Sequence, residues 1–266
     1  MTNFEKVIEF NKCFGLPHYE TEQTNIFTEN PKLLNLRISL CDEEIKELEE
    51  AINTNDFIEV IDALTDELYV IYGAASSLGI NIDEMIKKHT SNNENVSNFS
   101  KICIYNLSMM EQTEIEYNQL NYRNYKEGNI MKKILEDDKK HIVKSQLISL
   151  KKLISTLQSC VSSQNFTDIK NTLLMLLVKT YRLGQFLSID LDESFAIVHN
   201  SNMSKLCSTE KQAQETVELY KKNDKRYDTP NYRLSYNQKY WVIYNESTGK
   251  ILKNKDYIPA NFESLL

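Results

Sequence analysis

The chain has 266 residues, a net charge of −7 and 41% hydrophobic residues, with only 6 Gly and 4 Pro. This composition favours a sizeable core built from long helices, in one or two structural units. The acidic pI near 5.3 argues against a protein that coats nucleic acid, because that role needs a basic surface. No hydrophobic run approaches membrane-spanning length, so we expect a cytoplasmic protein without a membrane partner.

The hydrophobic spacing predicts helices over most of the chain. In order, they cover residues 4–13, 33–52, 56–78, 83–88, 102–120, 130–141, 147–161, 166–187, 192–198 and 210–222. An Asn- and Ser-rich stretch at 91–100 reads as a link. Alternating residues 240–244, a turn at 245–249 and residues 250–253 predict a β-hairpin. The predicted fold class is therefore all-α with a small C-terminal β-hairpin.

Two acidic clusters occur within this helical pattern. Their members are Glu43, Glu44 and Glu47 in the first cluster and Glu59, Asp62 and Asp66 in the second. Residues three or four apart share a helix face, so two antiparallel helices would bring these carboxylates together. Crowded like charges are unfavourable unless cations bind them, and hard oxygen ligands suit Mg²⁺ or Mn²⁺. The alternative is that the acids form a solvated helix face.

Each acidic helix also carries a hydrophobic stripe that predicts its buried side. In the first helix the expected stripe is Leu36, Leu40, Ile45, Leu48 and Ile52, and in the second it is Ile61, Leu64, Leu68 and Ile71. The cysteines are expected to be free, buried thiols of a reducing compartment, because they are odd in number and form no Cys-x-x-Cys pair. They are Cys13, Cys41, Cys103, Cys160 and Cys207.

The chain also contains an internal repeat at an offset of 109 residues. Residues 45–84 align without a gap on residues 154–193, and the identical pairs are mostly hydrophobic. The acids do not repeat, since Leu153 and Thr156 stand opposite Glu44 and Glu47. We expect an active half and a supporting half that pack as an internal pseudo-dimer. The alternative is that two unrelated amphipathic hairpins happen to align.

The predicted organisation follows from this repeat. Residues 1–90 form the acid-bearing half, residues 91–141 a linker with a helical insertion, and residues 142–266 the degenerate second half with the hairpin. Homo-oligomerisation of such chains through their outer faces is left open.

These segments together resemble the all-α nucleoside triphosphate pyrophosphohydrolases, the MazG-like and phosphoribosyl-ATP pyrophosphohydrolase-like group. The resemblance rests on residues 10–17, on both acidic clusters with the Leu68-Tyr69 that follows, and on residues 189–205. It ends at Tyr232-Arg233 and at residues 248–253. The acidic helices combined with Ser201-Asn-Met-Ser-Lys205 make the match fairly specific.

The resemblance implies hydrolysis of ribo- or deoxyribonucleoside triphosphates to the monophosphate and pyrophosphate, with Mg²⁺ or Mn²⁺ as cofactor, in nucleotide-pool control. By position, Glu43 would orient or deprotonate the attacking water. The implied metal ligands are Glu44, Glu47 and two of Glu59, Asp62 and Asp66. The implied phosphate-binding residues are Asn202 and Lys205, with Lys250 and Lys253 as further candidates.

Two other functions stay open at this point. The same helices could form a regulatory protein that binds nucleotides without cleaving them, or an enzyme that hydrolyses phosphoribosyl-ATP. Release of pyrophosphate would distinguish an enzyme from a regulator. For His199, Tyr240 and Trp241 we predict capping or packing roles, because a lone histidine near a helix end and aromatic residues in a strand usually serve structure.

Overall fold

The computed structural model describes residues 1–89 and 137–266, and most of these residues are helical, as expected. The helices are α1 (Asn3–Phe14), α2 (Ile26–Glu29), α3 (Pro31–Thr54), α4 (Phe57–Leu78), α5 (Ile82–His89), α7 (Asp137–Ser162), α8 (Phe166–Phe186), α9 (Leu191–Met203) and α10 (Glu210–Asn223). Two strands, β1 (Pro230–Leu234) and β2 (Trp241–Asn245), and the 3₁₀ helix η6 (Glu263–Leu265) complete these parts of the chain. The helix expected at 102–120, the link at 91–100 and Cys103 lie outside the described residues.

Polar side chains determine where the helices begin. Thr2 and Glu5 form a capping box at the start of α1, and the Asn30 side chain accepts from the Leu33 amide at the start of α3. Asp56 caps α4 in the same way. The caps at Asn30 and Asp56 fix where α3 and α4 begin. Because the connection between these two helices is short, they are antiparallel neighbours.

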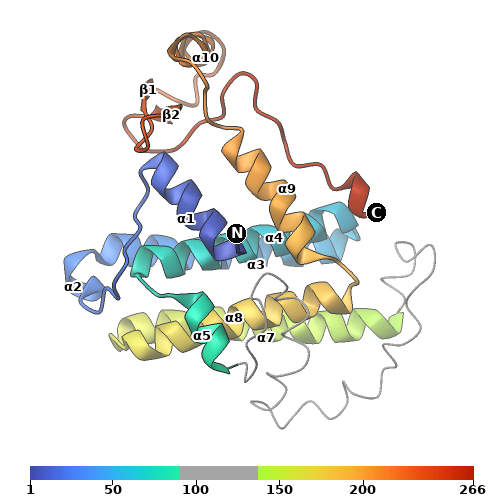
Figure 1. The fold of residues 1–266 in the computed structure, drawn as a ribbon. Helices are drawn as coiled ribbons and strands as arrows, with labels where there is room; N and C mark the ends of the chain where they lie inside the picture. The colour runs from blue at the N-terminus through green and yellow to red at the C-terminus, as the bar shows by residue number, and fades with distance from the viewer. Residues whose placement is uncertain (90–136) are drawn as a thin grey trace.

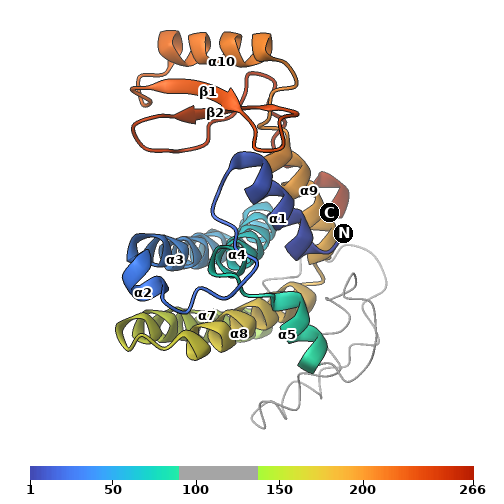
Figure 2. The same cartoon turned by 60° about the vertical axis from the view of Figure 1, so that its left-hand side comes forward.

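Two long hairpins form the body of the molecule. α3 pairs with α4 and α7 pairs with α8, and the two pairs pack through α3 on α7 and α4 on α8 (Figures 1 and 2). α1 and α9 pack together on α4. The side chains of Leu48, Leu64, Leu68, Leu157 and Leu177 in the resulting core are fully excluded from solvent.

The two hairpins share the register of the expected repeat. α4 and α8 start at Phe57 and Phe166, and the left-handed residues that precede them are Asn55 and Gln164. The hydroxyls of Tyr72 and Tyr181, 109 positions apart, lie 3.3 Å from each other. The interpretation of this register as an internal pseudo-dimer stays a prediction.

The N-terminus of α1 contacts both halves of the chain. Thr2 donates a 2.7 Å hydrogen bond to Asp83, at the start of α5. The neighbouring Asn3 donates a 2.7 Å hydrogen bond to Asp192, at the start of α9. Asp83 and Asp192 occupy equivalent positions in the aligned segments. The N-terminus of α1 therefore contacts the same position in both segments.

Two expectations about individual helices were wrong. The predicted helices 130–141 and 147–161 are one helix from Asp137, because the residues between them contain no breaker and Val143 and Leu147 are both buried. This helix crosses the domain boundary expected at residue 141. Leu36 is 52% exposed, since the buried stripe of α3 begins with Leu33 and Leu34 and continues at Ile38.

The predicted hairpin is present in part, and its first strand has a further partner. Residues 250–252 pair with β2 through backbone hydrogen bonds of 2.8 Å from Asn245 to Lys250 and 2.9 Å from Leu252 to Ile243. β2 also pairs antiparallel with β1, from Pro230 opposite Asn245 to Leu234 opposite Trp241, which the sequence did not predict. The Asn245 side chain explains this register. It accepts a 3.0 Å hydrogen bond from the Thr229 amide and so fixes the chain just before β1.

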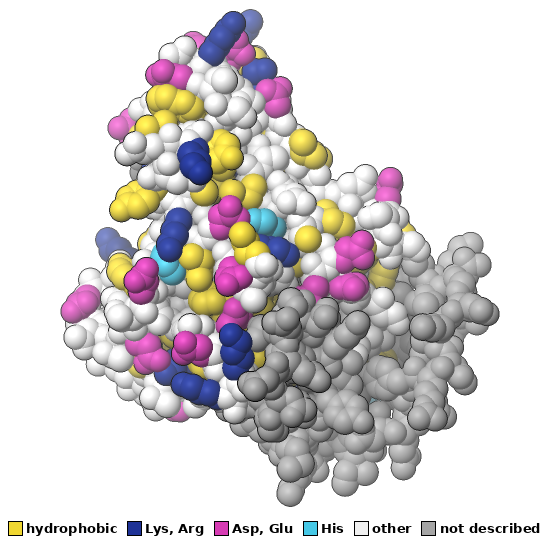
Figure 3. Space-filling model, viewed as in Figure 1, with side chains coloured by type: hydrophobic (Ala, Val, Ile, Leu, Met, Phe, Trp, Pro, Cys, Tyr) yellow, Lys and Arg dark blue, Asp and Glu magenta, His cyan; other side chains and the backbone are white. Residues whose placement is uncertain are grey.

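The remaining general expectations concern cysteines, membranes and charge. Cys13, Cys41, Cys160 and Cys207 are buried and free, as predicted. Within residues 1–89 and 137–266, no helix is long and hydrophobic enough to cross a membrane. On the face shown in Figure 3, basic side chains are interspersed with acidic and hydrophobic ones and form no continuous basic surface.

The turn after α4 generates a stability prediction. Gly79 has a φ of +67°, and a Cβ at this position would lie 1.8 Å from the Thr21 carbonyl oxygen. Gly249 has a φ of +70° but open space around its Cα. We expect Gly249→Ala to lower the free energy of unfolding by about 1 kcal/mol, the cost of the left-handed backbone alone. Gly79→Ala should cost clearly more, as measured by urea denaturation. Equal losses would contradict the close approach.

Candidate active site

The acids of α3 and α4 converge, as their spacing predicts. Burial, together with the neighbouring charges of Asp66, Glu47, Glu43 and Asp62, raises the pKa of Glu44 to about 8. Glu44 lies on α3, whereas Asp62 and Asp66 lie on α4, so the crowding acts across the hairpin. Like charges held this close disfavour one another's ionised form unless protons or cations neutralise them.

The other members of the cluster take part in the same interaction. Burial and the charge of Asp62 raise the pKa of Asp66 to about 7. Burial, followed by the charges of Glu43 and Glu59, raises the pKa of Glu47. Burial, Glu59 and Glu47 likewise raise the pKa of Asp62. The structure therefore brings all six predicted acids of the two clusters into one region.

This region offers oxygen atoms that could hold a cation. The buried Oε2 of Glu44 has no hydrogen-bond partner. Among the described residues, however, no group of three or more His, Cys, Asp and Glu is already gathered tightly enough to form a metal site. The donor set still fits Mg²⁺, which usually takes one or two carboxylates and completes its shell with water and substrate phosphates.

The late motif lies against these acids. Lys205 follows α9, and its Nζ donates a 2.6 Å hydrogen bond to Oδ1 of Asn202. Burial lowers the pKa of Lys205, whereas the nearby charge of Asp66 raises it. The Tyr69 hydroxyl, one turn beyond Asp66 on α4, lies 3.2 Å from Nδ1 of His199, which stands one turn before Asn202 on α9. Segments far apart in the sequence thus supply the acidic and the basic side of one region.

The two hairpin lysines differ in position. The charge of Lys253 lowers the pKa of Lys205, so Lys253 faces the same region, and its Nζ lies 4.4 Å from the Tyr257 ring centroid. Lys250 is instead on the exposed side of the sheet, where its Nζ lies 5.9 Å from the Tyr227 ring centroid.

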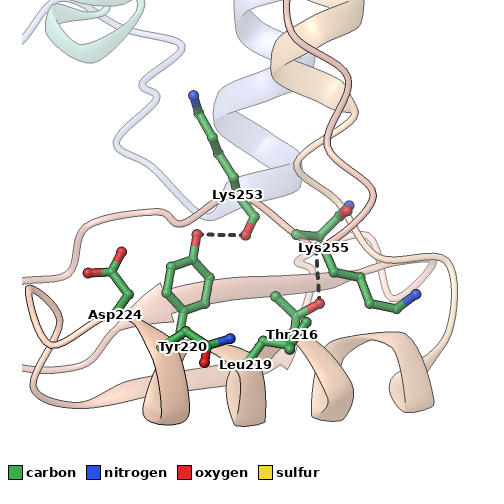
Figure 4. A pocket seen from close by; sticks show the side chains of 8 residues that line it. Thr216, Leu219, Tyr220, Asp224, Lys253 and Lys255 are labelled. Atoms are coloured by element: carbon green, nitrogen blue, oxygen red, sulfur yellow. Dashed lines mark hydrogen bonds between the residues drawn. The ribbon is translucent and has the colours of Figure 1, made fainter.

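A pocket of about 220 Å³ lies elsewhere, between α10 and residues 253–255. Figure 4 shows that Lys253 contributes its backbone carbonyl to this pocket, where it accepts a 2.9 Å hydrogen bond from Tyr220, while its side chain points away. None of the acids of α3 and α4 lines it. We therefore locate the candidate site at the acids and not at this pocket.

Several polar residues around the site were not predicted from the sequence. Glu67 is fully buried with both carboxylate oxygens unpartnered, and burial raises its pKa well above the ordinary value, which favours the neutral acid. His199, for which a capping or packing role was expected, is buried and contacts Tyr69 and Glu9. The sequence offered one clue to His199, because it stands three residues before Asn202 and therefore on the same face of the predicted helix. Glu9 and Glu67 carried no comparable signal.

The aromatic residues of β2 behave as predicted in part. Trp241 packs edge-on against Tyr232, with ring centroids 5.6 Å apart, which confirms a packing role. Tyr240 precedes the strand and is 37% exposed, and its expected packing role stays a prediction.

Comparison with known proteins agrees with this arrangement. The family model described as phosphoribosyl-ATP pyrophosphohydrolase matches residues 7–93, which contain both acidic clusters. Over 267 aligned residues the chain is 36% identical to the uncharacterized protein L479 of Acanthamoeba polyphaga mimivirus, with 100% of this chain and 96% of that protein covered. No solved structure matches the chain.

These findings define a helical protein of the MazG-like all-α superfamily. Residues 7–93 of the chain are a domain of the phosphoribosyl-ATP pyrophosphohydrolase family. Membership indicates a hydrolase-type activity on pyrophosphate bonds. The full-length match further shows that the second half, which lies beyond the family model, is shared with the viral relative.

The raised pKa values of Glu44 and Asp66 predict how stability depends on pH. Unfolding returns these acids from about 8 and about 7 toward their ordinary values of 4.5 and 3.8. At pH values between the ordinary and the raised pKa, the folded state binds more protons than the unfolded state. The free energy of unfolding therefore falls as pH rises. We expect the melting temperature of the metal-free protein to fall between about pH 5 and about pH 8 through this contribution.

Two variants isolate this effect in thermal-denaturation series. Glu44→Gln should flatten the decline, because the glutamine has no proton to lose. Glu29→Gln removes an exposed carboxylate of α2 and should retain the wild-type slope. A Glu44→Gln series that is as steep as the wild type would contradict the assignment.

Proposed function

We propose that this chain is a Mg²⁺-dependent nucleoside triphosphate pyrophosphohydrolase that cleaves ribo- or deoxyribonucleoside triphosphates to the monophosphate and pyrophosphate. Nucleotide-pool control in the cytoplasm is the corresponding cellular role. The observation that carries the proposal is the meeting of the α3–α4 acids with Lys205, seen in the mutual influence of Asp66 and Lys205. An acid cluster near a half-buried cation suits a ligand that brings both metal ions and phosphates.

Residue roles follow from this arrangement. Glu44, Glu47, Glu59, Asp62 and Asp66 would hold Mg²⁺, or Mn²⁺ as the alternative ion. When bound, such an ion neutralises phosphate charge and lowers the pKa of water. Glu43 is exposed at the edge of the cluster, where it would orient or deprotonate the water that attacks the α-phosphate.

Phosphate binding is assigned to the basic side of the site. Lys205 would donate to phosphate oxygens with the two ammonium hydrogens that Asn202 does not use. Asn202 and Lys253 would contribute further donors from the same region. Lys250 is the weakest of these assignments, because its contact with Tyr227 places it on the sheet surface.

The site would be composite, and the chain would contain one of them. The first half supplies the acids and the second half supplies Asn202 and Lys205. Support comes from the shared register of the two hairpins and from the contact between Tyr72 and Tyr181, which are equivalent residues. In this interpretation the chain is an internal pseudo-dimer with unequal halves.

Two alternatives are distinguished by one assay. The family model's own description favours phosphoribosyl-ATP as a substrate, and a regulatory protein would bind nucleotides without turnover. Pyrophosphate release should be measured with a panel of ribo- and deoxyribonucleoside triphosphates and with phosphoribosyl-ATP, with Mg²⁺, Mn²⁺ or a chelator. Release only from phosphoribosyl-ATP would select the first alternative, and binding without release would select the second.

Loss of a cluster acid should abolish turnover without damaging the fold. We expect Glu47→Gln and Asp62→Asn to lower metal-dependent kcat/KM by roughly 100-fold or more. Their thermal stability without metal should be unchanged or higher, because each change relieves repulsion. Glu50→Gln, an isosteric change of an exposed acid one turn beyond Glu47, is the control. Near-wild-type rates in both cluster variants would show that the site is elsewhere.

Loss of Lys205 should weaken phosphate binding. We expect Lys205→Ala to raise KM and to lower kcat/KM by roughly 10- to 100-fold, the effect of losing a charged hydrogen bond. Lys211→Ala removes an exposed lysine of α10 and should leave both constants unchanged. Calorimetry with a non-hydrolysable triphosphate should give one site per chain. Unchanged kinetics in Lys205→Ala, or two sites, would refute the composite site.

A further inference from the structure

The side chain of Asn254 holds the turn that carries Lys205. Its amide nitrogen donates a 2.7 Å hydrogen bond to the carbonyl oxygen of Ser204 and a second one, also of 2.7 Å, to the carbonyl oxygen of Leu206. Ser204 and Leu206 are the residues on either side of Lys205. Because α9 ends at Met203, the carbonyls beyond it have no partner within the helix. Asn254 therefore fixes the backbone both before and after the lysine.

The orientation of the Asn254 side chain is determined by its partners. It is 6% exposed, and its Oδ1 accepts a 2.6 Å hydrogen bond from the Asp256 amide. A carboxamide offers two N–H donors and one oxygen acceptor, and all three are used here. Exchanging the nitrogen and the oxygen would direct the oxygen at two carbonyls and leave their hydrogen bonds unmade. The carboxamide is thus held in one orientation.

Other residues of the same segment, 254–258, also contact the end of α9. The Ile258 amide donates a 3.0 Å hydrogen bond to the Ser204 hydroxyl, and the Tyr257 hydroxyl lies 2.8 Å from the Ser201 hydroxyl. The segment thus follows the last turn of α9 and the turn after it. This part of the chain contains both candidate phosphate-binding residues of the late motif.

Lys253 is attached to the same arrangement. It immediately precedes Asn254, and its Nζ lies 4.4 Å from the centroid of the Tyr257 ring. A cation is attracted to the face of an aromatic ring, so the ring supports the ammonium group while the tyrosine hydroxyl contacts α9. The positions of Lys205 and Lys253 are therefore linked through Asn254 and Tyr257.

We propose that Asn254 is a positioning residue, which fixes Lys205 relative to Lys253 so that the two lysines approach the phosphates of one substrate together. The kinetic consequence rests on the proposed function. The structural content, that the turn around Lys205 depends on the Asn254 carboxamide, does not. Without its two donors, the carbonyls on either side of Lys205 would lose their partners. The backbone that carries the ammonium group would then be free to move.

Two asparagine variants separate positioning from stability. Asn254→Ala removes both hydrogen bonds to the turn. Asn11→Ala removes another buried carboxamide, which donates a 3.0 Å hydrogen bond to Ser76 near the C-terminus of α4. We expect both variants to lower the melting temperature. Only Asn254→Ala should raise KM, by about five- to tenfold, with kcat changed much less. A wild-type KM in Asn254→Ala, or an equal increase in Asn11→Ala, would overturn the inference.

Two further variants test how Asn254 acts. Asn254→Asp keeps the shape of the side chain but replaces the nitrogen with an oxygen that cannot donate while ionised, so KM should rise at least as much as in Asn254→Ala. In a protein that already carries Lys205→Ala, Asn254→Ala should raise KM much less than in the wild type, because the effect acts through that lysine. A wild-type KM in Asn254→Asp, or the full increase in the Lys205→Ala background, would contradict the proposal.

Amide hydrogen exchange of the full chain tests the turn without any enzymatic activity. The amides of residues 204–207 are all hydrogen-bonded, so they should exchange slowly in the wild type without substrate. We expect faster exchange of a peptide covering these residues in Asn254→Ala and wild-type exchange in Asn11→Ala. Equal exchange in Asn254→Ala and the wild type would refute the role of Asn254. If the wild type hydrolyses none of the substrates but shows the expected difference, the proposed function fails while the role of Asn254 in the turn stands.

Discussion

The crowding of carboxylates between α3 and α4 is the constraint around which the structure is arranged. Charged groups are costly to bury, and here several of them share one partly buried region. The hydrophobic contacts of the same helices must outweigh that cost. Leu48 and Leu64, on the opposite sides of these helices from solvent, are completely buried and hold the acids together. The hydrophobic side of the hairpin thus stabilises it despite its acidic face.

This constraint explains why the basic residues come from another part of the chain. The lysine of α3 nearest the cluster, Lys46, is exposed and pairs with Asp42 at 2.6 Å. Lys205 stands after α9, where Asn202 holds its ammonium group beside Asp66. The acids and the lysine can therefore approach the same ligand from two sides. The family model stops at residue 93, yet the similarity to the viral relative extends through this second half.

Local patterns predicted the acid site better than they predicted its surroundings. The spacing of Glu44, Glu47, Asp62 and Asp66 was informative because a helix converts spacing directly into a shared face. The pairing of β2 with β1 was missed because strand pairing depends on distant contacts, here the Asn245 side chain and Thr229. Glu9 and Glu67 could not be found, since nothing in a single sequence shows which exposed-looking acid will meet a histidine or be buried.

The N-terminus of α1 has a consequence for how the two halves relate. Thr2 bonds to Asp83 and Asn3 bonds to Asp192, so adjacent residues of one helix engage equivalent positions in both segments. Two identical subunits related by an axis could not both place this helix on the axis. A covalently joined chain can, because it needs the helix once. In the proposed pseudo-dimer, the first turn of α1 would therefore break the symmetry of the pair and give each half a fixed identity, which would allow one half to specialise without the other.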